Sequence, residues 1–260
     1  MQNNKPIALN GQPIAGGKFP LTCTPLVGRT ADAILAELAV MLPKMPDMLE
    51  WRVDFFEEIG NTDAVIAMAA AIKNNSGSMP LLFTRRSIIE GGEKIALNEP
   101  EVIAMYTALC ESKVIDLIDY EMANDIANIV RVRDAAKASG IRLVLSFHDF
   151  SSTPGLNTLV AKFLTADQLG ADVAKVAVMP RDLSDVLTLL TATLEANKKL
   201  RIPLISMSMG PMGAITRMVG GVFGSSLSFA VGATASAPGQ IPIEDLNTVF
   251  TILQKSMGKP

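Results

Sequence analysis

The sequence predicts an α/β protein folded as a closed (β/α)8 (TIM) barrel, in which a cylinder of parallel strands is surrounded by helices. The chain has 260 residues, and short apolar segments alternate with amphipathic ones eight times along it. Barrels of this kind are typically about 250 residues long, and such alternation is typical of parallel βαβ units. A doubly wound sheet is the alternative, but no Gly-x-Gly-x-x-Gly motif opens the first predicted helix.

Eight apolar segments of strand length follow one another along the chain. Continuous apolar runs of this length are typical of strands buried on both faces. The predicted strands are 20–26, 48–54, 80–86, 114–121, 142–149, 173–179, 203–209 and 227–233.

Each predicted strand is followed by a segment with helical character. Asp182 and Ser184 can cap the start of one helix, and Gly140 and Gly170 follow the ends of two others. The predicted helices are 31–42, 63–73, 99–112, 125–139, 157–169, 183–197, 214–221 and 243–255.

The residues before the first strand predict a hairpin. Asn10-Gly11 lies between apolar residues in the segment 7–14, and an Asn-Gly pair in that setting is a strong hairpin signal. We expect this N-terminal β-hairpin to close the bottom of the barrel. Because no low-complexity linker interrupts the chain, residues 1–260 are predicted to form one domain, with 1–19 as its hairpin extension.

Composition excludes several classes of protein. The net charge is −3 and no block of Lys or Arg stands out, which argues against a nucleic-acid-binding surface. Residues 1–6 contain no apolar segment of the kind found in signal peptides, so no signal peptide is expected there. The uncharged stretch between Arg217 and Glu244 is broken by Gly and Ser, so we expect a short helix and a buried strand there and no membrane span. Cys23 and Cys110 lie far apart in sequence, which suits a reducing cytoplasm.

Lys175 lies within the apolar strand 173–179. Burial of an ammonium is costly unless it is paired, and a lowered pKa with a neutral amine is the usual outcome. A neutral lysine amine can form a Schiff base with a carbonyl substrate. A lysine at a strand end, or one paired with an interior carboxylate, is the structural alternative.

Other ionisable residues gather at the carboxyl ends of predicted strands, where barrels carry their functional groups. Glu50, Arg52 and Asp54 are predicted to share one face of a strand through its two-residue period. His148 is the only histidine and ends the strand before that of Lys175, so both side chains can reach one bound molecule. Its ordinary pKa suits proton transfer, although a lone histidine is often structural.

Three arginines predict an anionic substrate. Arg52, Arg86 and Arg217 carry forked donors that bind carboxylates, and positive charge near Lys175 favours its neutral form. Salt bridges to Glu50, Asp54 or Glu90 are the alternative role for these arginines. The segment 235–242 follows the last strand and is either a mobile lid that offers Ser236 and Gln240 to a ligand or an ordinary surface turn.

These residues together resemble a known family. Its motifs are matched by Glu-Trp-Arg-Val-Asp at 50–54, Leu-Leu-Phe-Thr at 81–84 with Arg86, and Glu-Gly-Gly-Glu at 90–93. Ser-Phe-His-Asp-Phe at 146–150, Lys175 with Met-Pro at 179–180, and Ser-Ala-Pro-Gly-Gln at 236–240 complete the set. The chain resembles the type I 3-dehydroquinate dehydratases over essentially its whole length after the hairpin.

The resemblance implies a homodimeric (β/α)8 barrel of the shikimate route that eliminates water from 3-dehydroquinate without metal or organic cofactor. Lys175 would form the imine, His148 would transfer protons, and Glu90 would pair with His148. The resemblance assigns substrate binding to Glu50, Arg52, Arg86, Arg217, Ser236 and Gln240. Some members place a substrate-contacting serine where this chain has Pro25, so that contact is absent or comes from Thr24.

Three other functions are compatible with parts of the pattern. A class I aldolase also uses a Schiff-base lysine, although the three arginines favour the dehydratase. A non-catalytic binding protein on the same scaffold would bind its ligand without turnover. A metal-dependent barrel enzyme would use carboxylates with the single histidine, namely Glu50, Asp54, Glu121, His148 and Asp149.

Overall fold

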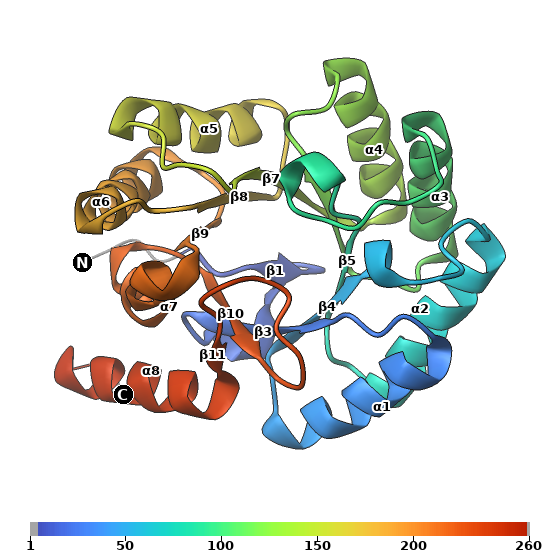
Figure 1. Cartoon of the computed structure of the whole chain (residues 1–260), viewed down its shortest axis with the longest axis horizontal. Helices are drawn as coiled ribbons and strands as arrows, with labels where there is room; N and C mark the ends of the chain where they lie inside the picture. Colours follow the sequence, from blue (N-terminus) through green and yellow to red (C-terminus); the bar gives the residue numbers. More distant parts are fainter. Residues whose placement is uncertain (1–4, 259–260) are drawn as a thin grey trace.

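The structure is a computed structural model that describes residues 5–258. Residues 1–4, which belong to the predicted hairpin extension, lie outside the described part, as do residues 259–260. Parallel strands form a curled central sheet that is surrounded by helices (Figure 1). All eight predicted barrel strands are present. They are β3 (Leu21–Leu26), β4 (Met48–Arg52), β5 (Leu81–Thr84), β6 (Leu117–Glu121), β7 (Arg142–Asp149), β8 (Val173–Val178), β9 (Leu204–Ser208) and β10 (Leu227–Val231).

The sheet order is β11-β10-β3-β4-β5-β6-β7-β8-β9, where β11 (Ile241–Pro242) is a short strand beside β10. Between β9 and β10 the barrel closes through a single parallel bridge, Leu204 to Ser225. The N–H of Ser226 donates to the carbonyl of Leu204 there, at 2.7 Å. The predicted (β/α)8 barrel is confirmed, with one weakly paired seam.

Helices follow the strands in the predicted order: α1 (Ala31–Met41), α2 (Thr62–Ser76), α3 (Glu99–Ser112), α4 (Ile126–Ser139), α5 (Leu156–Gln168), α6 (Leu183–Lys199), α7 (Gly210–Phe223) and α8 (Ile243–Ser256). Asn98 and Glu101 form a capping box at the start of α3, and Asp182 caps α6. The predicted start of α7 at residue 214 is wrong. The helix begins at Gly210, and Pro211 occupies its first turn. Proline is tolerated there because backbone N–H groups of the first turn have no acceptor within the helix, so the N–H that proline lacks is not missed.

Inward-facing side chains of the strands fill the bottom half of the barrel with apolar atoms. Leu21, Met48, Leu82, Leu117 and Val173 belong to this inner cluster, which is buried from solvent. Further along the same strands the inward positions become polar, as at Glu50 and Lys175. The lower half of the barrel is therefore a packed apolar core, and the upper half carries the polar side chains from which a functional site can be built.

The predicted N-terminal hairpin closes the bottom of this core. Its strands β1 (Ala8–Leu9) and β2 (Gln12–Pro13) pair antiparallel. Asn10 and Gly11 both have positive φ, 50° and 77°, as the two central residues of a type I′ turn require. Ile7 and Ile14 then pack into the inner apolar cluster.

No helix within residues 5–258 is long and apolar enough to cross a membrane. The uncharged stretch singled out in the sequence instead forms the C-terminal part of α7 and the buried strand β10, as predicted.

A glycine at the contact between α7 and β9 provides a test of this packing. A Cβ on Gly213 would lie 2.4 Å from the backbone of Ser208, so Gly213→Ala has to push α7 off the barrel. We expect a loss of about 1–3 kcal/mol in the free energy of unfolding, measured by urea denaturation. Gly60→Ala is the control, because its Cβ would meet nothing within 4 Å. Equal stability of the two variants would contradict the close contact.

Candidate active site

A cavity opens at the carboxyl end of the barrel strands. Its walls come from β4, β7, β8 and β10, from the loop after β5, from α7 and from the loop that precedes β11. All the site residues predicted from the sequence line it: Glu50, Arg52, Arg86, Glu90, His148, Lys175, Arg217, Ser236 and Gln240.

Lys175 projects from the middle of β8 into this cavity with only 4% of its side chain exposed. Its Nζ lies 3.0 Å from Asp119 Oδ2 and 3.6 Å from Glu50 Oε1. The same Nζ lies 4.6 Å from the centroid of the Phe229 ring, within range of a cation–π contact. The carboxylate pairing left open by the sequence is therefore present, and the amine still faces the cavity.

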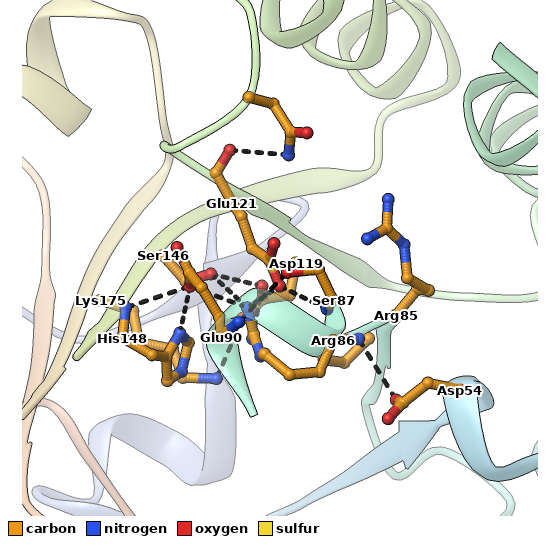
Figure 2. A network of polar contacts seen from close by, with 12 residues as sticks. Asp54, Arg85, Arg86, Ser87, Glu90, Asp119, Glu121, Ser146, His148 and Lys175 are labelled. Carbon is orange, nitrogen blue, oxygen red and sulfur yellow. Dashed lines mark hydrogen bonds and ion pairs between the residues drawn. The ribbon is translucent and has the colours of Figure 1, made fainter. Parts of the chain in front are cut away.

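Asp119 is the centre of the charge network beneath the cavity (Figure 2). Its Oδ2 accepts from Lys175, and its Oδ1 accepts from Arg86 Nη2 at 2.8 Å and from Ser146 Oγ at 2.6 Å. Burial raises the pKa of Asp119, but the positive charges of Arg86 and Lys175 outweigh burial and hold that pKa below its ordinary range. Asp119 is therefore an ionised anchor for the lysine.

Arg86 is engaged by the interior of the protein on several sides. Its Nη1 donates to Glu121 at 2.9 Å and to Ser146 Oγ at 3.0 Å, and it lies 3.5 Å from Glu90 Oε2. Arg86 lies two residues beyond the end of β5, so it approaches these groups from a loop and not from the predicted strand. Of these partners the sequence had offered only Glu90 as an alternative ion pair for this arginine; Glu121 and Ser146 were not expected. The role of Arg86 in substrate binding stays a prediction.

Asp54 does not share a strand face with Glu50 and Arg52, so that prediction was wrong. β4 ends at Arg52, and Asp54 lies in a 3₁₀ turn that brings its carboxylate back onto the Arg52 guanidinium at 2.8 and 2.7 Å. The same carboxylate accepts from the backbone N–H groups of Arg86 and Glu93. The turn thus orients Arg52 and ties down the loop that carries Glu90.

His148 and Glu90 form a close pair at the cavity wall. Glu90 Oε2 lies 2.7 Å from His148 Nδ1 and also accepts from the backbone N–H of His148 at 3.0 Å. Burial raises the pKa of Glu90 to about 8. Burial, with the charges of Arg86 and Lys175, lowers the pKa of His148 well below its ordinary value. The imidazole is therefore uncharged near neutral pH, as a proton acceptor must be.

Arg217 differs from the other two arginines because no carboxylate of the described residues lies within 4.0 Å of it. It is 2% exposed, and Nη1 and Nη2 lie 3.5 and 3.3 Å from the backbone carbonyls of Phe229 and Pro238. Burial lowers its pKa to about 10, which leaves it charged at neutral pH. A buried, uncompensated guanidinium facing a cavity is a site for an anion.

The loop between β10 and β11 crosses the mouth of the barrel (Figure 1). Within it, Gln240 Oε1 accepts from the Ser236 N–H at 2.9 Å, and Gln240 Nε2 lies 3.2 Å from Ser236 Oγ. The Pro238 carbonyl accepts from the N–H of Gly210 at 3.1 Å, so the loop rests on the start of α7. Whether it acts as a mobile lid stays a prediction.

Comparison with known proteins assigns the chain to a family. A model of the type I 3-dehydroquinase family matches residues 22–257. The chain belongs to this family. It is 70% identical over 258 residues to the 3-dehydroquinate dehydratase of Albidiferax ferrireducens, covering 99% of this chain and 98% of that protein. Identity to the 3-dehydroquinate dehydratase of Aromatoleum aromaticum is 51% over 99% of both chains.

Solved structures of type I 3-dehydroquinases share the fold throughout. The 3-dehydroquinate dehydratase of Geobacillus kaustophilus superposes with a TM-score of 0.94 at 47% identity, covering 98% of this chain and 99% of that chain. The type I enzyme of Clostridium difficile, solved with covalently modified comenic acid, gives 0.91 at 36% identity, covering 98% and 100%. The family resemblance carried by the motifs and the expected assignment to a hydro-lyase family are both confirmed.

Sequence reasoning about this type I 3-dehydroquinase gave no role to Asp119. A signal was available in the two-residue period of β6. Leu117 belongs to the inner apolar cluster, so Asp119 and Glu121, two and four residues later, also face inward. The sequence does not say, however, which cations these carboxylates meet. Neither Thr24 nor Pro25 lines the cavity.

The carboxylates that a metal-dependent alternative would need are divided among other partners. Asp54 binds Arg52, and Asp149 Oδ1 and Oδ2 accept from Ser151 and Ser152. Within residues 5–258, no group of three or more His, Cys, Asp or Glu side chains is arranged to hold a metal ion.

The single histidine makes the His148–Glu90 pair measurable by NMR. We expect no imidazolium signal at or above pH 6.5, because burial and the neighbouring cations lower the pKa of His148. Glu90 has a raised pKa of about 8, so as pH rises through that value its carboxylate forms and draws the ring proton onto Nδ1. Ring ¹⁵N shifts should report this tautomer change. Glu90→Gln should abolish the step near pH 8; a histidine that becomes charged above pH 6.5 would contradict the assignment.

Proposed function

We propose that this chain eliminates water from 3-dehydroquinate in the syn sense, giving 3-dehydroshikimate, through an imine on Lys175. The observation that carries the proposal is that Lys175 and His148 face one cavity from adjacent strands. In the β7–β8 register Lys175 lies opposite Ser146, and His148 lies opposite Ala177, one inward position further along. The 3-dehydroquinate dehydratases that share 70% and 51% identity with the chain support the same substrate.

The first step joins the lysine to the substrate ketone. His148 takes a proton from the Lys175 ammonium, and the neutral Nζ attacks the carbonyl carbon. His148 then returns that proton to the carbinolamine hydroxyl, which leaves as water and gives a protonated imine. Asp119 and Glu50, at 3.0 and 3.6 Å, stabilise the positive charge that the nitrogen carries before and after this step. The covalently modified comenic acid in the C. difficile relative is consistent with a reactive nucleophile in that protein.

The second step is the elimination. The protonated imine makes the hydrogen on the neighbouring carbon acidic, and His148 removes it while the electron pair forms an enamine. When the enamine returns to the imine, it expels the hydroxyl one carbon further on, and His148 returns its proton to make water. The proton leaves and returns on the face that holds His148, which gives the syn course. Hydrolysis of the imine then releases the product and restores Lys175.

Glu90 and the arginines orient the reactants. The base-competent tautomer of His148 carries its proton on Nδ1. It forms as pH rises through about 8, where Glu90 ionises and its carboxylate can accept that proton at 2.7 Å. Arg217 supplies the uncompensated charge for the substrate carboxylate. Ser236 and Gln240, which bond to each other, would exchange that contact for the substrate hydroxyls, assisted by Glu50, Arg52 and Arg86.

The biological setting follows from the family. We propose that the reaction is the third step of the shikimate route to chorismate and aromatic amino acids, and that it needs no metal or organic cofactor. A cytoplasmic location is supported by the two buried cysteines, Cys23 and Cys110, which are both free thiols. A homodimer rests on the family resemblance.

Imine trapping tests the nucleophile directly. We expect incubation with 3-dehydroquinate and borohydride to inactivate the enzyme and to leave one reduced adduct, located on Lys175 by peptide mapping. Lys175→Met should give neither adduct nor turnover. Lys162→Met is the control, because Lys162 lies on α5, contacts the ring of Phe147 on β7, and does not line the cavity. An adduct on another lysine, or turnover without an adduct, would refute the mechanism.

His148→Ala separates imine formation from proton transfer. Loss of a general acid–base group typically costs 10²–10⁴-fold in rate, and we expect kcat to fall by about that factor. The reduced adduct should still form, more slowly, because Lys175 is intact. Turnover close to that of the natural protein would remove His148 from the proposed role.

A further inference from the structure

Tyr106 lies on α3, outside the cavity, yet its hydroxyl contacts the backbone of β6 and of Arg85, the residue that follows β5. It is fully buried. The hydroxyl oxygen accepts from the backbone N–H of Arg85 at 3.1 Å and donates to the backbone carbonyl of Asp119 at 2.9 Å. These are the main-chain groups of Asp119 itself and of the residue that precedes Arg86.

The hydroxyl acts where β5 leaves the sheet. The register of β5 with β6 ends at the pair Thr84–Asp119, and Arg86 follows two residues later. On the opposite side of the same backbone, the Asp119 side chain accepts from Arg86 at 2.8 Å and from Lys175 at 3.0 Å (Figure 2). One hydroxyl therefore holds the backbone on which the lysine's counter-ion and its arginine partner depend.

The Tyr106 ring is held rigidly in a row of buried aromatic rings. Its centroid lies 5.5 Å from Phe83 and 5.7 Å from Tyr120, with interplanar angles of 81° and 80°. Edge-to-face contacts of this kind stabilise aromatic pairs beyond the effect of burial alone. Since the ring cannot easily shift, the hydroxyl sets the positions of the two strand ends and does not follow them.

We propose that Tyr106 is a positioning residue for the reaction, acting through Asp119 and Arg86 on the placement of Lys175. Without the hydroxyl, the Arg85 N–H and the Asp119 carbonyl each lose a partner in a place that water does not reach. Buried unpaired backbone groups are costly, so the strand ends must move to find new partners, and Asp119 moves with them. This inference rests on the proposed imine chemistry of Lys175.

The test compares Tyr106→Phe with Tyr120→Phe in the full-length chain. Tyr120 belongs to the same aromatic row, and its hydroxyl donates to Glu99 at 2.6 Å, so each change removes one hydroxyl from a buried ring. The Tyr106 hydroxyl bonds to two backbone groups, whereas the Tyr120 hydroxyl bonds to a side chain. For Tyr106→Phe we expect kcat and the rate of borohydride-trapped adduct formation to fall about tenfold or more. KM should change less than about twofold, and the pH profile of kcat should shift. Tyr120→Phe should change none of these by more than about twofold.

Each result decides between positioning and a purely structural role. Urea denaturation of both variants shows whether they lose similar stability; matching kcat, trapping rate and pH profile in the two variants would overturn the proposal. If the natural protein itself yields no adduct, the proposed function fails first, and the two failures are thereby distinguished.

A second measurement covers the case in which Tyr106→Phe does not fold. The chain has two tyrosines, so in Tyr120→Phe the hydroxyl of Tyr106 is the only phenol. Incorporation of 3-fluorotyrosine makes that phenol more acidic while keeping it in place. We expect the pH profile of kcat to shift relative to unlabelled Tyr120→Phe, and an unchanged profile would overturn the proposal.

Discussion

The contact between Asp119 and Lys175 is the interaction on which the rest of the site depends. An ammonium in the apolar interior of a barrel is costly unless a counter-ion accompanies it, and Asp119 meets Lys175 at 3.0 Å with both side chains buried. Asp119 needs partners of its own, which Arg86 and Ser146 provide. Arg86 in turn draws in Glu121. One buried lysine thus requires a connected network of charges, and that network occupies the upper half of the barrel.

Arg217 marks where the network is incomplete. Arg52 and Arg86 are each bound by carboxylates of the protein, whereas the partners of Arg217 among the described residues are two backbone carbonyls and the sulfur of Met207. The cost of holding that charge without a partner is recovered when an anion enters. The site therefore combines a satisfied part, which fixes the lysine, with an unsatisfied part, which favours a carboxylate-bearing substrate.

The fold separates these demands along the barrel axis. The hairpin residues Ile7 and Ile14 and the first inward residues of the strands form an apolar lower core, so the polar upper layer rests on a packed floor. Outside the barrel, helix α3 places Tyr106 against the strand ends that carry the network. The Asp54 carboxylate accepts hydrogen bonds from the backbone N–H groups of Arg86 and Glu93 and so fixes the loop after β5.

The sequence by itself determined the alternation of strands and helices, the hairpin, the strand that carries Lys175, and the strand ends at which Arg52 and His148 lie, because apolar periodicity and turn residues are local signals. The motifs further determined the family. Only the tertiary structure decided that Asp119 anchors Lys175, that Asp54 curls out of β4 onto Arg52, and that Arg217 alone of the three arginines lacks a carboxylate. The physical reason is that a two-residue period tells which face of a strand a side chain occupies, but not which charge lies opposite. That depends on how distant strands are aligned in the sheet and on the closure of the barrel. Lys175 and Asp119, for example, are 56 residues apart in sequence and lie on strands separated by β7.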